Sequence, residues 1–260
     1  MKKLFINGII CSALVLSVLS GGIEAKAATT SNNSKETIEQ ESLQELTKQS
    51  EKDRLAAESK MKLTDEYAKT KKKQEKKSVV LRSAGSSKTI SRYATEEQQE
   101  SNWCGPAAAY NATNGAHTQM QYASDLLTKM YGWTPFPGTW KGVLNTDRPG
   151  NNYEAIKGAN YSDLVDWTNK LRNSIIYTID KGYPVIADCH ITSDTSTRIH
   201  SGYSYATDTK HYVVVIGYND TVSPMKVRIV DSHTSDDIPA TYWTTVDKLG
   251  AATKDFGIVW

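Results

Sequence analysis

The chain is poor in cysteine and has no apolar run of membrane-spanning length. Its three cysteines in 260 residues are too few for a disulfide framework. The longest apolar run, from about Leu4 to Leu19, covers roughly 16 residues, whereas a spanning helix needs about 20. The formal net charge of +2 is ordinary for a globular protein. We therefore expect no nucleic-acid partner, and no membrane span once the leader is removed.

The first 27 residues have the pattern of a secretory signal peptide. Lys2 and Lys3 precede the apolar run, and the alanines of AKA at 25–27 form an A-x-A cleavage site. We expect cleavage between Ala27 and Ala28, and a secreted protein that is extracellular or associated with the cell wall. A retained membrane anchor is the alternative, and the shortness of the run argues against it.

Residues 28–92 lack Trp, Phe, Cys and Pro. Helix-forming residues dominate from Ser34 to Lys77, and RSAGSSK at 82–88 is typical of a flexible connector. The segment 28–92 carries 15 Lys and Arg against 10 Asp and Glu, net +5, whereas 93–260 carries 13 against 18, net −5. The segment is therefore either a pro-segment that docks on the next domain and covers its active site, or a solvated spacer whose basic run could also bind an anionic cell-wall polymer.

The stretch QQESNWCGPAAAY at 98–110 places a cysteine where a helix begins. Pro106 is favoured in a first helical turn, and the three alanines that follow continue the helix. Cys104 therefore lies at the helix N-terminus, where backbone N–H groups and the helix dipole stabilise a thiolate. A buried structural cysteine is the alternative. Gln98, six residues upstream, carries an amide that could donate to an oxyanion beside the sulfur.

From Tyr93 onward the chain is aromatic and patterned, as expected for one folded domain over 93–260. Apolar spacing predicts a helix at 119–131, and another that begins after the cap residue Ser162 and ends at Lys181-Gly182. The segment 132–159 is expected to be a loop whose large aromatic side chains pack on the core, and a loop that forms the wall of a cleft is the alternative.

The stretch YPVIADCHI at 183–191 is predicted to be a strand. Alternation places Cys189 on one face and Asp188 and His190 on the other. Cys189 is therefore expected to be a core residue that cannot pair with His190. No ligand spacing supports a metal site on His190 and Asp188, so we expect no metal.

More strands follow a long polar loop at 192–210, whose length is typical of functional or mobile loops. Apolar patterning predicts them at YVVVIGY (212–218), KVRIVD (226–231) and FGIVW (256–260), with a strand end and a short capped helix at 241–250.

A hairpin brings a candidate base beside a candidate carboxylate. His211 opens the first strand and Asp231 closes the second, so antiparallel pairing places them at the same end. If Tyr218 pairs with Lys226, Asp231 faces Val213, within diagonal reach of His211. The carboxylate would then fix the imidazole tautomer and stabilise its protonated form.

His211 is therefore the expected base for the Cys104 thiol, with Asp231 as its orienting group. The alternative base is His233, which lies at the end of the same hairpin.

These segments resemble the papain-like cysteine peptidases, in particular the bacterial branch similar to the bacteriocin-processing, C39-like peptidase domain. The matching pieces are Gln98, NWCGPAAA (102–109), HYVVVIGYND (211–220) and VRIVDS (227–232). The resemblance covers about 93–260. It implies an α+β fold in which an N-terminal helical subdomain with the cysteine packs on an antiparallel sheet with the histidine and the aspartate.

The resemblance also implies residue roles. Cys104 becomes the nucleophile, His211 the base and acid, Asp231 the orienting group and Gln98 the oxyanion donor, with no cofactor. The expected protein is a secreted cysteine peptidase that acts on a protein or peptide. A cell-wall amidase or transpeptidase with the same Cys-His chemistry, and a catalytically inactive binding module, are the alternatives.

Overall fold

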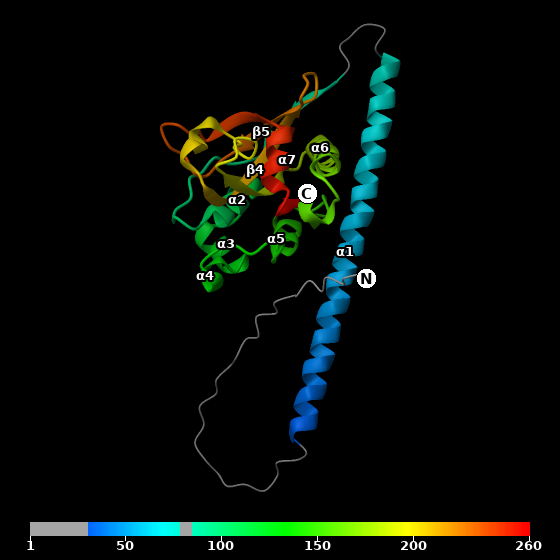
Figure 1. The fold of residues 1–260 in the computed structure, drawn as a ribbon, viewed down its shortest axis with the longest axis vertical. Coiled ribbons are helices and arrows are strands. Elements are labelled where there is room, and N and C mark those ends of the chain that lie inside the picture. Colours follow the sequence, from blue (N-terminus) through cyan, green and yellow to red (C-terminus); the bar gives the residue numbers. More distant parts are fainter. Residues whose placement is uncertain (1–30, 79–84) are drawn as a thin grey trace, which may run out of the picture. The chain divides into compact units, whose positions relative to one another are not determined.

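The computed structural model describes residues 31–78 and 85–260, with side chains of the first range described from 48 to 75. The predicted signal peptide, 1–27, lies outside the described residues. The chain divides into two units, Met1–Lys48 and Gln49–Trp260. Helix α1 (Ser31–Ser78) begins in the first unit and continues in the second, and the sheet and the other helices all belong to the second (Figure 1).

A seven-stranded sheet forms the centre of the second unit, and all its strands pair antiparallel. The strand order is β2-β7-β3-β4-β5-β6, and β1 pairs with the end of β4 that β3 leaves free. The strands are β1 (Ser87–Thr89), β2 (Ala155–Lys157), β3 (Val185–Thr192), β4 (Asp208–Asn219), β5 (Lys226–Val230), β6 (Thr241–Thr245) and β7 (Gly257–Val259). Since β1 lies upstream of Tyr93, the sheet includes residues that the sequence assigned to a connector.

Besides the second part of α1, six α-helices accompany the sheet among the described residues of this unit, so the fold is α+β, as predicted. They are α2 (Cys104–Thr113), α3 (Gln119–Asp125), α4 (Thr128–Tyr131), α5 (Trp140–Asp147), α6 (Leu164–Asp180) and α7 (Val246–Thr253). Short 3-10 turns lie at Gly158–Asn160 (η1) and Ser201–Tyr205 (η2). Figure 1 shows α2 to α5 gathered together and α6 beside α7. No helix among the described residues is long and apolar enough to cross a membrane.

The prediction of one helix over 119–131 is wrong. Leu127 has a left-handed backbone with φ of 62°, which separates α3 from α4. Met120 and Met130, whose spacing suggested an apolar helix face, are more than half exposed. Ala123 and Leu126, which share this spacing, are buried, so the expected apolar face is buried only in its middle.

The expected loop at 132–159 also contains regular structure, namely α5 and β2. Its Trp140 is fully buried and packs 5.1 Å from the ring of Tyr212, whereas Trp133 is exposed. The helix predicted to start after Ser162 is α6, but its cap is Asp163, whose carboxylate accepts from the N–H of Asp166 at 2.8 Å.

The pairing of β4 with β5 differs from the expected register by one residue near the turn. At the other end of the hairpin, the pairing agrees with the expected register. Tyr218 pairs with Val227 instead of Lys226. A bulge between Val215 and Gly217 then shifts the pairing by one residue, so that Val214 faces Val230. Continued by one residue, this register places Asp231 opposite Val213, as predicted.

The second part of α1 packs on the domain through a narrow stripe at helical spacing. The buried residues of this stripe are Ala57, Lys60, Met61, Thr64 and Ala68. Leu55 and Leu63 are half exposed, so small and polar side chains make the contact instead of leucines. The sequence predicted the helix but not this face of it.

Polar contacts of both charge signs hold this part of α1. Lys60 Nζ donates to the carbonyls of Asn152 at 2.7 Å and of Trp260, and lies over the Trp260 ring. Asp65 accepts from Lys170 of α6 at 2.5 Å. Lys71 forms an ion pair with Asp180, the last residue of α6. The Tyr218 hydroxyl donates to Asp180 and accepts from Lys71.

Candidate active site

Helix α2 places Cys104 at its first position, as the sequence predicted. Trp103 precedes the helix, and its side chain makes no capping hydrogen bond. The side of α2 that faces the core consists of small residues, namely Ala107, Ala108, Ala109 and Ala112, all at most 1 % exposed. Because these side chains are short, the helix lies close to its neighbours, while Cys104 itself stays half-buried.

The residue after the cysteine has to be a glycine. A Cβ at Gly105 would lie 2.1 Å from the Oγ1 atom of Thr134. Thr134 belongs to the segment 132–139 between α4 and α5, and its carbonyl accepts from the Tyr212 hydroxyl at 3.1 Å. This loop therefore lies against both the first turn of α2 and strand β4, so the close packing at Gly105 fixes the position of the cysteine relative to the sheet.

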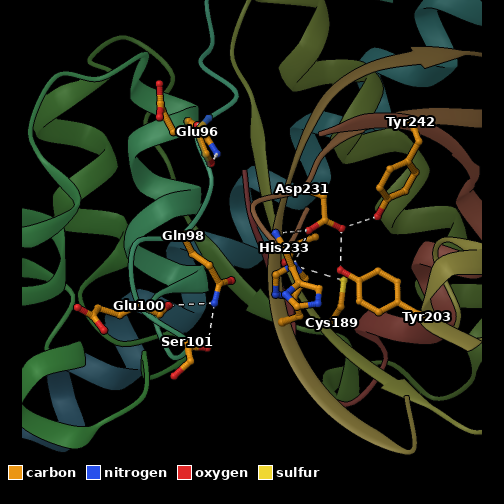
Figure 2. Close-up of polar contacts among 12 residues, drawn as sticks. Glu96, Gln98, Glu100, Ser101, Cys189, Tyr203, Asp231, His233 and Tyr242 are labelled. Carbon is orange, nitrogen blue, oxygen red and sulfur yellow. Dashed lines mark hydrogen bonds and ion pairs between the residues drawn. The ribbon is translucent and has the colours of Figure 1, made fainter. Parts of the chain in front are cut away.

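His211 and Asp231 form a buried pair. The Nε2 atom of His211 lies 2.7 Å from Oδ1 of Asp231, and the two residues are 4 % and 0 % exposed. His211 is in β4, and Asp231 directly follows β5, in the diagonal relation that the bulged register produces. Figure 2 shows the carboxylate at the centre of this group of side chains.

The charge of this pair is set by its surroundings. Burial alone would lower the pKa of His211, but the charge and hydrogen bond of Asp231, with a smaller contribution from Cys104, raise it to about 10. Burial alone would raise the pKa of Asp231, but the charge of His211 and hydrogen bonds to the carboxylate lower it. The pair is therefore an imidazolium and a carboxylate at neutral pH, with Cys104 close enough to affect the histidine.

Three further donors reach Asp231, and sequence reasoning missed the two side chains among them. The hydroxyls of Tyr203 and Tyr242 each donate to Oδ2 at 2.8 Å, and the backbone N–H of His233 donates to Oδ1 at 2.9 Å (Figure 2). Tyr203 lies in a loop without periodicity, and Tyr242 lies in β6 with no motif around it. No pattern in the sequence singled out either tyrosine.

The alternative base, His233, contacts Asp231 only through its backbone. Its exposed ring lies 6.1 Å from the His211 ring, and its Nε2 is 2.9 Å from the Tyr205 hydroxyl. Of the two histidines, His211 is thus the one whose imidazole meets the carboxylate.

Gln98 is beside the site, but its amide points elsewhere. Its backbone N–H donates to the carbonyl of Ser232 at 3.0 Å, which ties the segment before α2 to the residue after Asp231. Its Nε2 donates to the carbonyls of Glu100 at 3.0 Å and Ser101 at 2.9 Å (Figure 2). The buried Oε1 has no hydrogen-bond partner among the described residues. The oxyanion role of Gln98 stays a prediction.

Among the described residues, no polar side chain of β3 makes a hydrogen bond to His211 or Asp231. Cys189 is fully buried, as predicted, and burial raises its pKa well above the usual value. His190 pairs with Asp208 at 2.7 Å, whereas burial raises the pKa of Asp188 to about 7. Within residues 31–78 and 85–260, no three His, Cys, Asp or Glu side chains are grouped so that they could hold a metal ion.

Comparison with known protein families identifies the family of this chain. The Peptidase_C39 like family model matches residues 88–256, which include α2, both strands of the His-Asp hairpin and all of β1 except Ser87. The chain belongs to this C39-like family. A comparison with curated proteins gave no match. Membership in the C39-like family suggests cysteine peptidase activity, and the start of the match at residue 88 agrees with β1 being part of the sheet.

Proposed function

We propose that this C39-like protein is a cysteine peptidase in which Cys104, His211 and Asp231 act together. One observation carries the proposal. His211 is bound to a buried carboxylate through Nε2, and Cys104 at a helix start contributes to its raised pKa of about 10. A nucleophile, a base and a group that orients the base are the set that covalent acyl transfer needs.

The proposed reaction has two steps. The thiolate of Cys104 attacks the carbonyl carbon of a peptide bond, and His211 gives its proton to the leaving amine as the C–N bond breaks. A water molecule then loses a proton to His211 and attacks the thioester; the C–S bond breaks, the second product leaves as an acid, and the Cys104 thiolate and the His211 imidazolium are restored. Asp231 stays ionised throughout and holds the imidazole in place.

The first turn of α2 is the preorganised oxyanion donor in this proposal. The N–H groups at a helix start have no partner within the helix and point along its axis. Both Cys104 and Gly105 contribute such a group, and Pro106 has none. Gln98 could add a donor only after its amide turns away from the carbonyls of Glu100 and Ser101.

Two alternative functions use the same residues differently. A cell-wall amidase or transpeptidase would attack another amide with the same thiol, and would transfer the acyl group to water or to an amine. An inactive binding module would hold a peptide without cleaving it. The intact His211–Asp231 pair favours catalysis, because a buried ion pair costs free energy that binding alone does not require.

Secretion and the role of the segment 28–92 belong to the same proposal. The leader pattern supports export. The contact of Lys71 of α1 with the Tyr218 hydroxyl is at the end of β4 opposite His211, seven residues or about 23 Å along the strand. Together with the contact between Asp65 and Lys170 of α6, it supports a helix that is fastened to the domain. Autoinhibition by 28–92 stays a prediction, as does association with the cell wall.

The experiment for the peptidase is digestion of a proteome-derived peptide library by the full chain. The matched control is the same chain with Cys104→Ala. New peptide termini that appear only with the unaltered cysteine support the peptidase. Cleavage of amide bonds in cell-wall peptides, without cleavage of any library peptide, would favour the amidase. Binding of library peptides without cleavage would favour the binding module.

A separate experiment tests whether the segment 28–92 inhibits hydrolysis. A site-specific protease sequence placed at 79–84 would allow the chain to be cut between α1 and β1, with hydrolysis followed at low and high salt. Faster hydrolysis after the cut, with a smaller difference at high salt, would support an electrostatically docked pro-segment. Equal rates would support a spacer.

A further inference from the structure

The Asp231 carboxylate receives more donors than its role toward His211 requires. Oδ1 accepts from His211 and from the backbone N–H of His233, whereas Oδ2 accepts from two phenols, those of Tyr203 and Tyr242 (Figure 2). The phenols come from separate elements, η2 and β6, and both tyrosines are at most 7 % exposed. Oδ2 is therefore enclosed by two neutral donors on the side away from the histidine.

The two phenols act only as hydrogen-bond donors to Asp231. Burial and the neighbouring Asp231 raise the pKa of Tyr203 and of Tyr242, so both hydroxyls keep their protons and donate. A hydrogen bond donated to a carboxylate stabilises its ionised form. Two such bonds on one oxygen also fix the plane of the carboxylate, and this plane directs Oδ1 at His211 Nε2.

We propose that Tyr203 and Tyr242 are positioning residues that keep Asp231 ionised and aimed at His211. The inference rests on the proposed function of the same site. It assigns a role to the segment 193–207 between β3 and β4, because Tyr203 makes the ionisation of the carboxylate depend on where this loop lies.

The loop is held beside the site at several points. The Tyr205 hydroxyl lies 2.9 Å from Nε2 of His233, and the His200 ring packs 4.5 Å from the Tyr242 ring. At Gly202, a Cβ would lie 2.4 Å from the side chain of Ile238, so the loop backbone approaches the segment between β5 and β6 as closely as a glycine allows. Displacement of this loop would withdraw the Tyr203 hydroxyl from Asp231.

A pH effect at Asp231 has to be considered with the other ionisable groups that face the carboxylate. These groups come from β3, η2, β4, the segment after β5, and β6, and they are Cys189, Tyr203, Tyr205, His211, His233 and Tyr242. The carboxylate holds His211 charged at neutral pH. Both phenols donate their hydroxyl hydrogen to Asp231, so loss of either phenol acts directly on the ionisation of this carboxylate.

The test uses Tyr203→Phe, Tyr242→Phe and the double variant in the full chain. Each change removes one hydroxyl and keeps the ring. Tyr218→Phe is the matched control, because that hydroxyl also donates to a carboxylate, Asp180 Oδ1, at 2.8 Å, but at the other end of β4. Thermal unfolding followed by circular dichroism shows whether each variant folds.

Two rates are measured as functions of pH. One is kcat/KM for a cleaved peptide, and the other is alkylation of Cys104 by iodoacetamide, which needs no substrate. Each single Phe variant should lower kcat by about tenfold or more with KM unchanged, since a hydrogen bond to a charged group is worth about 1.5–3 kcal/mol. The acid-side midpoint of both profiles should move to higher pH, and further in the double variant, because Asp231 then gains its proton more readily.

Profiles of both single variants that match Tyr218→Phe would overturn the inference. So would loss of the fold in both single variants while Tyr218→Phe folds, since the phenols would then serve the core instead of the site. If the unaltered chain cleaves no peptide, the proposed function fails. The alkylation profile still shows whether Tyr203 and Tyr242 position Asp231. A shifted alkylation profile without peptide cleavage would support the positioning role at a site that acts on another amide.

Discussion

Replacement of Asp231 by asparagine tests the site most sharply because the change is small and the local geometry is known. The carboxylate accepts four hydrogen bonds, from His211, the His233 N–H, Tyr203 and Tyr242. An amide has one oxygen, so its NH2 group would face either the imidazole or the two phenols. The variant therefore loses the negative charge in a fully buried site. An NH2 group at the Oδ1 position would also face the backbone N–H of His233, which can only donate, whereas at the Oδ2 position it would leave both phenols without their acceptor.

The size of the effect follows from the histidine. Burial disfavours the His211 cation, yet Asp231, with a smaller contribution from Cys104, raises the pKa from 6.5 to about 10, which favours the imidazolium by about 3.5 powers of ten. Loss of the orienting carboxylate in a triad can lower kcat by about 10⁴, or roughly 5 kcal/mol in the barrier. We expect Asp231→Asn to lower kcat by about 10³ to 10⁴.

The assay is steady-state hydrolysis of a peptide identified from the library, with thermal unfolding measured in parallel. Asp180→Asn is the matched control, because Asp180 also accepts from tyrosine hydroxyls but lies at the far end of β4. His233→Ala should lower kcat far less than Asp231→Asn. An Asp231→Asn variant that stays within tenfold of the unaltered chain, or that falls no further than Asp180→Asn, would refute the reasoning.

Three further outcomes are expected. Iodoacetamide should modify Cys104 in the folded chain near pH 6 and leave the buried Cys189 unmodified, as peptide mass mapping would show, whereas equal labelling would contradict the assignment. Because its pKa is raised to about 10, His211 stabilises the fold fully below about pH 6.5, and this contribution should disappear as pH rises through about 10 in denaturant titrations. Lys60→Ala should lower the free energy of unfolding by about 1–3 kcal/mol and expose α1 to proteolysis, whereas the exposed Lys62→Ala should change little.

Local signals in the sequence were sufficient for the elements that carry the candidate site. The proline and alanines after Cys104 predicted the start of α2, and the apolar runs predicted β4 and β5. The register was one residue off at the turn, because no pattern predicts the bulge between Val215 and Gly217. The bulge corrected that error on the side of the hairpin where Asp231 lies, so the expected pairing with His211 holds despite it.

Features that depend on tertiary contacts were beyond prediction from one sequence. The break at Leu127 comes from a left-handed backbone in a residue that ordinarily continues a helix. The buried stripe of α1 has few large apolar residues, so the sequence pattern suggested a helix that is exposed to solvent on all sides. Tyr203 reaches Asp231 from 28 residues upstream through a loop, and only the folded chain brings these two side chains together.

Detection of the acyl-enzyme tests the central claim most directly. The full chain is mixed with a cleaved peptide, quenched in acid within the first turnovers and analysed by intact mass and peptide mapping. The account predicts a thioester of the N-terminal part of the peptide on Cys104, and its absence in Cys104→Ala. Peptide cleavage that proceeds unchanged in Cys104→Ala, or an adduct on another residue, would contradict it.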